Sequence, residues 1–166
     1  MKAARFVLLW LAPGFAFSQA NPWYQTDFPP QEFHARWTKI FDKIGNNAVA
    51  VLQGVSLTNG FIMPRQGNDF YYLCGVETPH SYLLLDGRQK KVTLYLPPRN
   101  ARLESAEGKV LSADDADLVK RLTGVDEVAS TAAMQADFLR PQVGPVGGLA
   151  PAIYTPFSPA EGSAQS

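Results

Sequence analysis

Cysteine and histidine are both scarce in this sequence. Among its 166 residues there is one cysteine, Cys74, and there are two histidines, His34 and His80. One cysteine excludes an intrachain disulfide framework and a cysteine-based zinc site, and we expect Cys74 to be buried as a small hydrophobic side chain. Neither histidine has acidic residues at a spacing that would complete a metal site. We therefore expect His34 on the surface of a helix, His80 in a turn, and no metal or other cofactor bound by this chain.

The sequence also lacks an excess of charge of either sign. Lysine and arginine together number 15, as do aspartate and glutamate, so the formal net charge is zero. The longest basic run is Arg88-Gln89-Lys90-Lys91, which is typical of a solvated turn between two strands. Because nucleic-acid-binding proteins usually carry a basic face, we predict no nucleic-acid partner.

No apolar run is long enough to predict a membrane anchor. The longest, at 6–17, has about a dozen residues, whereas a membrane-spanning helix needs about 20. Lys2 and Arg5 precede the run, and Ser18-Gln19-Ala20 follow it. A positive start, an apolar middle and a small-x-small end are typical of a signal peptide, although a buried N-terminal helix is the alternative. We predict a signal peptide at 1–20, a mature chain that begins near Asn21, a secreted or periplasmic location, and no membrane attachment after cleavage.

The rest of the chain alternates helical and strand patterns. After an extended arm at 21–30, apolar residues at helical spacing predict a helix that begins at Gln31 and ends at Gly45. Further helices are expected at 112–122 and 131–139. Short apolar runs bounded by turn residues predict strands at 48–52, 81–86, 92–96 and 125–128, and the middle two should form a hairpin. This alternation predicts an α/β fold with a mixed β-sheet flanked by helices.

The composition changes after Arg140. Residues 141–166 are rich in proline and glycine, and only the stretch at 152–155 has a strand pattern. We assign 31–140 to one domain and 141–166 to the end of that domain or to a linker. Because the last residues read as part of a loop, we expect the sequence to be a truncated fragment of a longer protein.

One segment carries a more specific pattern. It runs from Pro64 to Pro79 and reads Arg-Gln, two residues, then Asp-Phe-Tyr-Tyr-Leu-Cys-Gly, followed by Glu and Pro. The pattern resembles the signature of the N-terminal domain of aminopeptidase P (Xaa-Pro aminopeptidase), in the creatinase/prolidase N-terminal domain family. The signature residues in this segment are Arg65, Gln66, Asp69, Phe70, Tyr72, Leu73 and Gly75.

Other features that resemble this family follow in the family's order along the chain. Phe33, Ala35 and Arg36 match its opening helix, and 48–54 match its first strand. A later strand ends with Pro97, Pro98 and Arg99, and an acidic element follows it, matched by Glu104 and Gly108. The resemblance extends from residue 31 to about residue 130. This sequence departs from the family at Pro64, Gly67 and Ala106, where the family has an aromatic residue, an acid and a tryptophan.

The resemblance implies a ribonuclease H-like, non-catalytic domain that helps to form oligomers and to close the substrate channel. In the family, a separate C-terminal pita-bread domain holds two manganese ions and hydrolyses peptides that have proline in second position. The partners that the resemblance implies are therefore that catalytic domain and further copies of this chain. Because the family's metal ligands are absent from this sequence, we predict that the chain alone is inactive. The alternative is an independent secreted α/β binding module without peptidase activity.

Two local expectations concern the signature segment. Phe70, Tyr72 and Leu73 should point into the core between the opening helix and the sheet. Arg65 and Asp69 are four residues apart and could pair with each other or cap the turn that Phe70 opens. Alternatively, Arg65 could face the catalytic domain or a neighbouring subunit.

Overall fold

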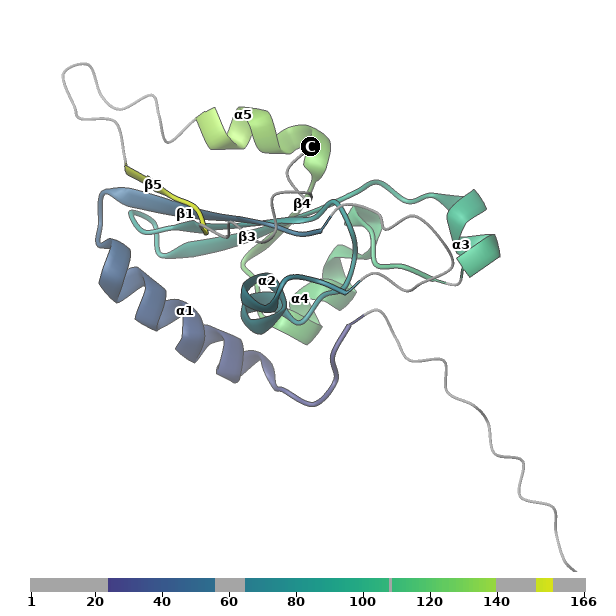
Figure 1. The fold of residues 1–166 in the computed structure, drawn as a ribbon, viewed down its shortest axis with the longest axis horizontal. Helices are drawn as coiled ribbons and strands as arrows, with labels where there is room; N and C mark the ends of the chain where they lie inside the picture. The colour runs from purple at the N-terminus through teal and green to yellow at the C-terminus, as the bar shows by residue number, and fades with distance from the viewer. Residues whose placement is uncertain (1–23, 56–64, 108, 140–151, 157–166) are drawn as a thin grey trace, which may run out of the picture.

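A five-stranded β-sheet forms the centre of the protein. The computed structural model describes residues 24–55, 65–107, 109–139 and 152–156. Within these residues the strand order is β4-β3-β2-β1-β5 (Figure 1). The strands are β1 (Ala48–Gln53), β2 (Tyr82–Asp86), β3 (Lys91–Leu96), β4 (Glu127–Ser130) and β5 (Ala152–Tyr154).

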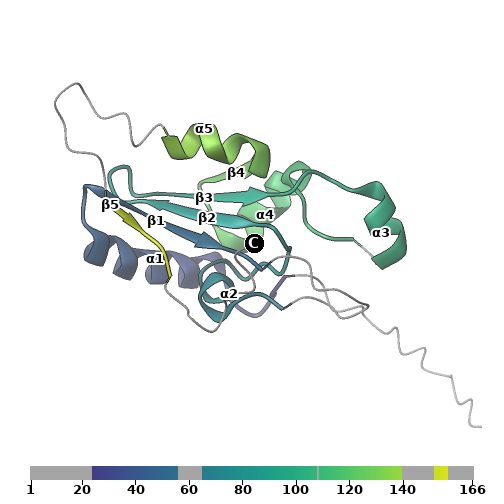
Figure 2. The ribbon, with the colours of Figure 1, turned by 45° about the horizontal axis from the view of Figure 1, so that its top comes forward.

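The sheet is mixed because only β2 runs against the other strands. It pairs antiparallel with both β1 and β3, as the predicted hairpin requires, whereas β4 and β5 pair parallel with β3 and β1. The carboxyl ends of β1 and β3 and the amino end of β2 therefore meet at one end of the sheet. We call this the α3 end, because helix α3 (Ala101–Glu107) lies beyond it (Figure 2).

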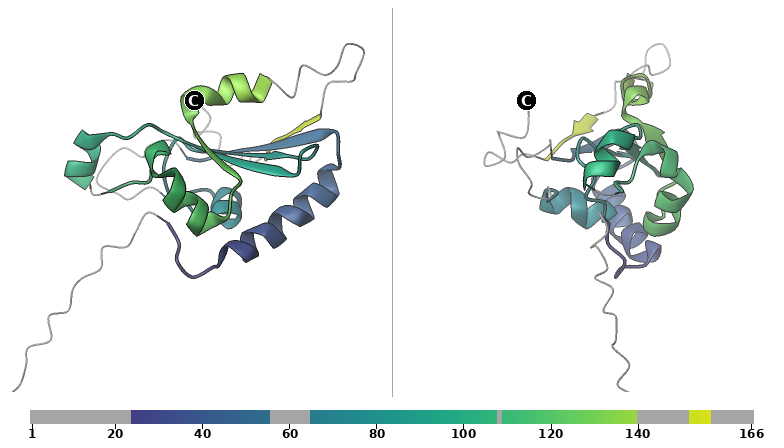
Figure 3. Two further views of the ribbon diagram at one scale, coloured as in Figure 1. Left: turned by 180° about the vertical axis from the view of Figure 1, so that it is seen from behind. Right: turned by 90° about the vertical axis from the view of Figure 1, so that its right-hand side faces the viewer.

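Helices cover the two faces of the sheet unequally. The helices α1 (Pro30–Ile44), α2 (Asn68–Cys74) and α4 (Ala116–Thr123) lie on one face, and α5 (Met134–Leu139) lies on the other (Figure 3). Single 3₁₀ turns, η1 (Ala113–Asp115) and η2 (Thr131–Ala133), lead into α4 and α5. None of the helices in the described part of the chain is long and apolar enough to cross a membrane.

The main core lies between the sheet and α1. The apolar periodicity that predicts this helix has a direct structural counterpart, because Phe33, Trp37 and Phe41 are buried on one side of it. The indole Nε1 of Trp37 donates a hydrogen bond of 2.9 Å to the carbonyl oxygen of Leu73, which joins α1 to α2. A smaller apolar cluster on the opposite face includes Tyr95, with Met134 of α5 packed against it.

The predicted fold class is confirmed, but several elements differ from their predicted bounds. The helices α2 and α3 were not predicted. Helix α1 begins one residue early, at Pro30, because proline suits the first turn of a helix, where no backbone donor is needed. Strand β4 begins at Glu127 instead of Val125, whose side chain is 3% exposed and belongs to the main core. The predicted signal peptide and most of 141–166 lie outside the described residues.

Candidate functional site

A buried polar clamp holds the signature segment to the sheet. The side-chain amide of Gln66 accepts a hydrogen bond from Val55 N at 2.8 Å and donates one to Thr78 O at 2.7 Å. The backbone N–H of Gln66 donates to a carboxylate oxygen of Glu77 at 2.8 Å. Gln66 and Glu77 are both buried. Breaking the clamp would leave buried polar groups without partners, so it stabilises one conformation of the segment.

Arg65 extends from this clamp towards solvent. Its side chain is 77% exposed, and its Nη1 lies 3.4 Å from a carboxylate oxygen of the buried Glu77. Arg65 therefore pairs with Glu77, and not with Asp69 as predicted. The rule for helical neighbours does not apply to these two residues, because α2 begins only at Asn68. Asp69 lies in the first turn of α2 instead, where an acid is favourable next to the helix dipole.

The short helix α2 buries one side and exposes the other. Phe70 and Leu73 are 2% and 5% exposed, which confirms that they face the core. Cys74 is also fully buried, as predicted, and burial raises the pKa of its thiol to about 12. A thiol that remains protonated at neutral pH is a poor nucleophile, so Cys74 serves packing.

The prediction that Tyr72 points into the core is wrong, because its side chain is 52% exposed. Phe70, Leu73 and Cys74 share the buried side of α2. With 3.6 residues per turn, Tyr72 lies about half a turn from Phe70, so it lies on the outer side of the helix. Its ring stacks on the guanidinium of Arg36, whose Cζ lies 4.1 Å from the ring centroid. Arg36 also donates hydrogen bonds to Glu32 and to the carbonyl oxygen of Tyr72. This buried arginine therefore ties α2 to α1.

Gly75 ends α2 where the N-terminal arm crosses it. Its φ of 66° and ψ of 17° are left-handed, a conformation that glycine adopts without strain. The backbone N–H of Gln25 donates to Gly75 O at 2.8 Å, and Tyr24 forms an isolated antiparallel bridge with Val76. The described part of the predicted arm, residues 24–30, is thus attached to the end of α2.

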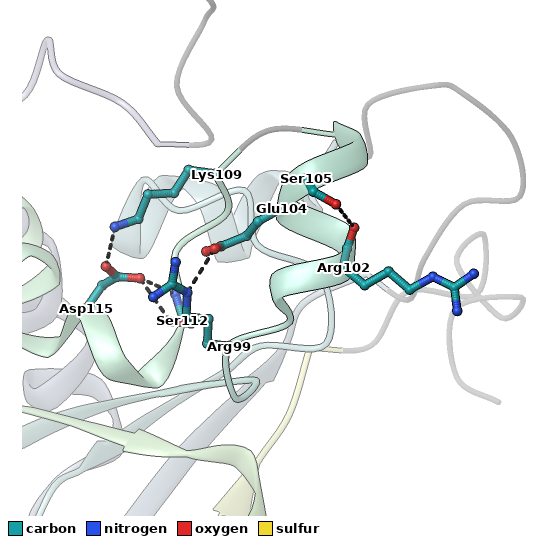
Figure 4. A network of polar contacts seen from close by, with 7 residues as sticks. All are labelled: Arg99, Arg102, Glu104, Ser105, Lys109, Ser112 and Asp115. Atoms are coloured by element: carbon teal, nitrogen blue, oxygen red, sulfur yellow. Dashed lines mark hydrogen bonds and ion pairs between the residues drawn. The ribbon is translucent and has the colours of Figure 1, made fainter.

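The second family segment, Pro97 to Glu104, leaves the carboxyl end of β3. The Nε of Arg99 donates to Oε2 of Glu104 at 2.8 Å, and this ion pair links the strand exit to α3 (Figure 4). The other carboxylate oxygen of Glu104 is buried and has no hydrogen-bond partner among the described residues. Gly108 lies outside the described residues. Ala106, which stands where the family has tryptophan, lies in α3.

A capping box fixes the chain that returns from α3. Asp115 accepts hydrogen bonds from the backbone N–H and the hydroxyl of Ser112, at 3.0 and 2.9 Å, and from Lys109 at 2.6 Å. Burial acts to raise the pKa of Asp115, but the hydrogen bonds from Lys109 and Ser112 outweigh it and hold the pKa below its ordinary value. The predicted N-cap at Ser112 is confirmed by this box.

The two family segments meet at the α3 end of the sheet. The hydroxyl of Thr78 donates to Leu111 O at 3.1 Å, and Ala113 N donates to Pro97 O at 3.0 Å. Between the two family segments lies a pocket of about 430 Å³, which we call the two-segment pocket. Its walls come from 78–80, from 97–101 with Glu104, and from 110–112. Arg65, Gln66, Pro97, Pro98, Arg99 and Glu104 thus gather at one end of the sheet, whereas Asp69, Phe70, Tyr72, Leu73 and Gly75 lie on or next to α2.

The described residues offer no evident metal site. They contain no group of three or more histidine, cysteine, aspartate and glutamate side chains that could hold an ion. His34 is exposed on α1, and His80 is exposed in a turn with a φ of 54°, as expected for both. Sequence reasoning missed the central role of Glu77 and Thr78. The sequence does offer one signal, because Glu77 is a single acid between the apolar stretch 70–76 and the strand that begins at residue 82.

The fold and the two clamped segments define a mixed α/β domain whose most elaborate polar structure lies at one end of its sheet. A model of the family described as "Aminopeptidase P, N-terminal domain" matches residues 33–141. The chain belongs to this family.

Curated relatives and solved structures agree with this membership. The chain is 35% identical over 91 residues to a protein of Botryotinia fuckeliana named as a probable Xaa-Pro aminopeptidase, a match that covers 55% of this chain and 19% of the relative. It is 30% identical over 99 residues to the Xaa-Pro aminopeptidase of Haemophilus influenzae, covering 56% and 23%. The chain thus spans about a fifth of the length of these curated relatives.

Among solved structures, Escherichia coli aminopeptidase P with the inhibitor Pro-Leu superposes with a TM-score of 0.59 at 19% identity. That match covers 69% of this chain and 27% of the other. A Bacillus anthracis protein described as a candidate aminopeptidase P superposes with a TM-score of 0.62 at 13% identity. That match covers 79% of this chain and 31% of the other. At these identities the two superpositions establish the fold.

Proposed function

We propose that this chain is the non-catalytic N-terminal domain of a Xaa-Pro aminopeptidase, in which it helps to close the substrate channel and to form oligomers. One observation carries the proposal. The two segments that resemble the family signature are far apart in the sequence but border one pocket at the α3 end of the sheet. Each is hydrogen-bonded to the chain that returns from α3, the first through Thr78 to Leu111 and the second through Pro97 to Ala113. A surface that is clamped in this way is suited to face a second folded body, because little conformational entropy is lost on contact.

The position of α3 supports the same proposal. This helix extends beyond the end of the sheet and lies apart from the other helices (Figure 2). The Arg99–Glu104 ion pair and the hydrogen bond of 3.0 Å from Glu104 N to Asn100 O hold it locally. A helix that projects from a domain, and that is joined to the exposed Arg99 by an ion pair, is placed to contact a catalytic domain or a neighbouring subunit.

The chemistry would then belong to the catalytic domain. In this proposal that domain would hold two manganese ions, and these would supply an activated water for hydrolysis of the peptide bond before proline. Oxygen-rich ligands with an imidazole suit manganese, and the described residues of this chain contain no such cluster. The substrates are peptides with proline in second position, and this domain contributes shape and contacts to the channel.

Arg65→Ala in a full-length enzyme tests the proposed contact surface. We expect the free energy of unfolding to fall by no more than about 1 kcal/mol, because the arginine is mostly exposed and its pairing with Glu77 is long. We expect turnover per folded molecule, or oligomer assembly, to fall by about tenfold, which is the effect of losing about 1.4 kcal/mol of contact energy. Denaturant titration, steady-state kinetics and light scattering measure the three quantities.

Arg121→Ala is the matched control, because Arg121 is an exposed arginine on α4. It should leave stability, turnover and assembly unchanged. If Arg65→Ala lowers stability but leaves turnover per folded molecule intact, the role of Arg65 is internal to the domain. If it changes none of the three quantities, Arg65 is an ordinary surface residue and the proposed contact is wrong.

We also propose export of the protein, on the evidence of its first twenty residues. Lys2 and Arg5 precede an apolar run that ends at Ser18-Gln19-Ala20, the pattern of a cleaved signal peptide. Mass spectrometry of protein from an exporting host should find a mature chain that begins near Asn21. Soluble cytoplasmic protein that retains Met1 would refute the proposal.

A further inference from the structure

A second hollow of the domain shares no lining residue with the two-segment pocket. It runs between α1, α2 and the edge strand β5, has a volume of about 470 Å³, and we call it the α1–β5 groove. Its floor is apolar, and the floor residues come from three elements: Ile40, Ile44, Ala50, Leu52 and Leu73. Lys39 and Lys43 of α1 form part of its rim, together with Tyr72 and Tyr154. In Figure 2, β5 lies along the sheet edge beside α1.

Most of the exposed large apolar side chains of the described residues lie at or near this groove. The exposed set is Phe28, Tyr72, Ile153 and Tyr154, between 44% and 52% exposed. Tyr72 and Tyr154 line the groove, and Phe28 stacks on the same Arg36 guanidinium as Tyr72 does. Ile153 lies between two residues of β5 and so points to the opposite face of that strand from Tyr154. Such a concentration of exposed apolar groups is typical of a surface that a partner covers.

The edge strand is also short. Strand β5 pairs with β1 from Ala48 to Ala50 only, and it stops at Tyr154. Continued in the same register, the next residues would bring Pro156 opposite Leu52, and proline has no N–H to donate to a neighbouring strand. The part of β1 beyond Ala50 therefore lines the groove where β5 ends, as do Thr155 and Pro156.

We propose that the α1–β5 groove is the docking site for the polypeptide beyond residue 166 in a full-length enzyme. This inference rests on the proposed function, since it requires that the chain be one domain of a longer protein. The docked segment should present apolar side chains to the floor and acidic side chains to Lys39 and Lys43. Cations outnumber acids in the lining of the groove, which contains Arg36, Lys39 and Lys43 but, as its acid, Asp69. It would cover both the groove and the exposed edge strand.

Two observations favour this occupant over a separate protein. Thr155 and Pro156 are themselves part of the groove wall, so the chain leaves the described domain from inside the groove. A segment tethered at that point has a high effective concentration at the site. The matched relatives supply ample polypeptide, because the aligned part of this chain covers only 19% and 23% of two of them.

Chemical labelling of lysines tests the proposal. The 166-residue chain and the longer protein encoded by the continuing reading frame are acetylated under identical conditions, and each lysine is quantified by mass spectrometry. In the 166-residue chain, Lys39 and Lys43 should react as fast as the exposed control Lys120 of α4. In the longer protein they should react about tenfold more slowly, as expected for a groove that is open about a tenth of the time, while Lys120 is unchanged.

A pair of variants makes the test specific. Lys39→Glu should restore fast labelling of Lys43 in the longer protein, because it repels an acidic segment, whereas Lys120→Glu should not. Equal labelling of Lys39 and Lys43 in the two proteins would overturn the proposal. So would a 166-residue chain that is dimeric by light scattering and that Tyr154→Ser makes monomeric, because the groove would then take a second copy.

Hydrolysis of a Xaa-Pro peptide by the longer protein separates this inference from the proposed function. An active protein with an accessible groove would refute only the docking site. A protein with a protected groove but no such activity would refute only the aminopeptidase function. A reading frame that ends at codon 166 would refute both.

Discussion

The Leu73→Ala variant is expected to lose about 2–5 kcal/mol of unfolding free energy, the range for truncating a buried leucine. Leu73 is 5% exposed and belongs to the cluster that contains Phe33 and Trp37. Its carbonyl oxygen accepts the Trp37 indole hydrogen bond at 2.9 Å, so a shift of α2 into the vacated space would also disturb this contact. Urea titration followed by tryptophan fluorescence measures the loss.

Asn68→Ala is the matched control for Leu73→Ala. Asn68 is an exposed residue at the start of the same helix, so the unfolding free energy of the variant should lie within about 0.5 kcal/mol of that of the parent. A similarly small effect of Leu73→Ala would contradict the burial of α2 against the core. The signature segment would then be a surface element rather than a packed one.

The Gly75→Ala variant is expected to lose about 2–4 kcal/mol of unfolding free energy, because left-handed backbone strain and overpacking both destabilise it. An added Cβ would lie 2.4 Å from Cγ of Gln25 and 2.9 Å from Cζ of Phe33. Both neighbours are buried, and Phe33 is fully enclosed in the main core. The methyl group can be accommodated only by moving the N-terminal arm off α2, so limited proteolysis near Tyr24 should become faster as well.

Gly124→Ala separates the two causes. Gly124 ends α4 with a φ of 77° and a ψ of 10°, nearly the conformation of Gly75. An added Cβ would lie 2.7 Å from the ring of His34, an exposed side chain that can turn away, and 2.9 Å from Cβ of the half-buried Pro30 at the start of α1. We expect a loss of about 1–2 kcal/mol of unfolding free energy, from the left-handed conformation and a smaller overpacking cost than at Gly75, because neither neighbour is fully buried. Equal losses for the two variants would show that the packing of the arm against Gly75 contributes nothing.

The sequence predicts those elements of the fold whose patterns are long or bounded by turn residues. Helix α1 has four turns of apolar periodicity, and the β2–β3 hairpin has two apolar runs around Asp86-Gly87, so both were found. The helix α2 has seven residues, which is too few for a helical period to stand out from a plain apolar run. For the same reason the outward direction of Tyr72 could not be deduced.

The polar clamp could not be predicted because its partners are distant in the sequence. Gln66 meets Glu77 and Thr78 only after α2 has turned the chain back, and Thr78 meets Leu111 only after the hairpin and α3. The family resemblance identified Arg65, Gln66 and Glu104 as significant but did not assign their contacts. The structure supplies these contacts and replaces the expected Arg65–Asp69 pair with Arg65–Glu77.

The most direct test of the central claim is hydrolysis of a Xaa-Pro peptide in the presence of manganese. The measurement compares the isolated 166-residue chain with the longer protein encoded by the continuing reading frame. We predict release of the N-terminal residue by the longer protein, loss of that activity on chelation, and no hydrolysis by the isolated chain. Metal-dependent hydrolysis by the isolated chain, or none by the longer protein, would contradict the assignment of this chain as the non-catalytic domain of a Xaa-Pro aminopeptidase.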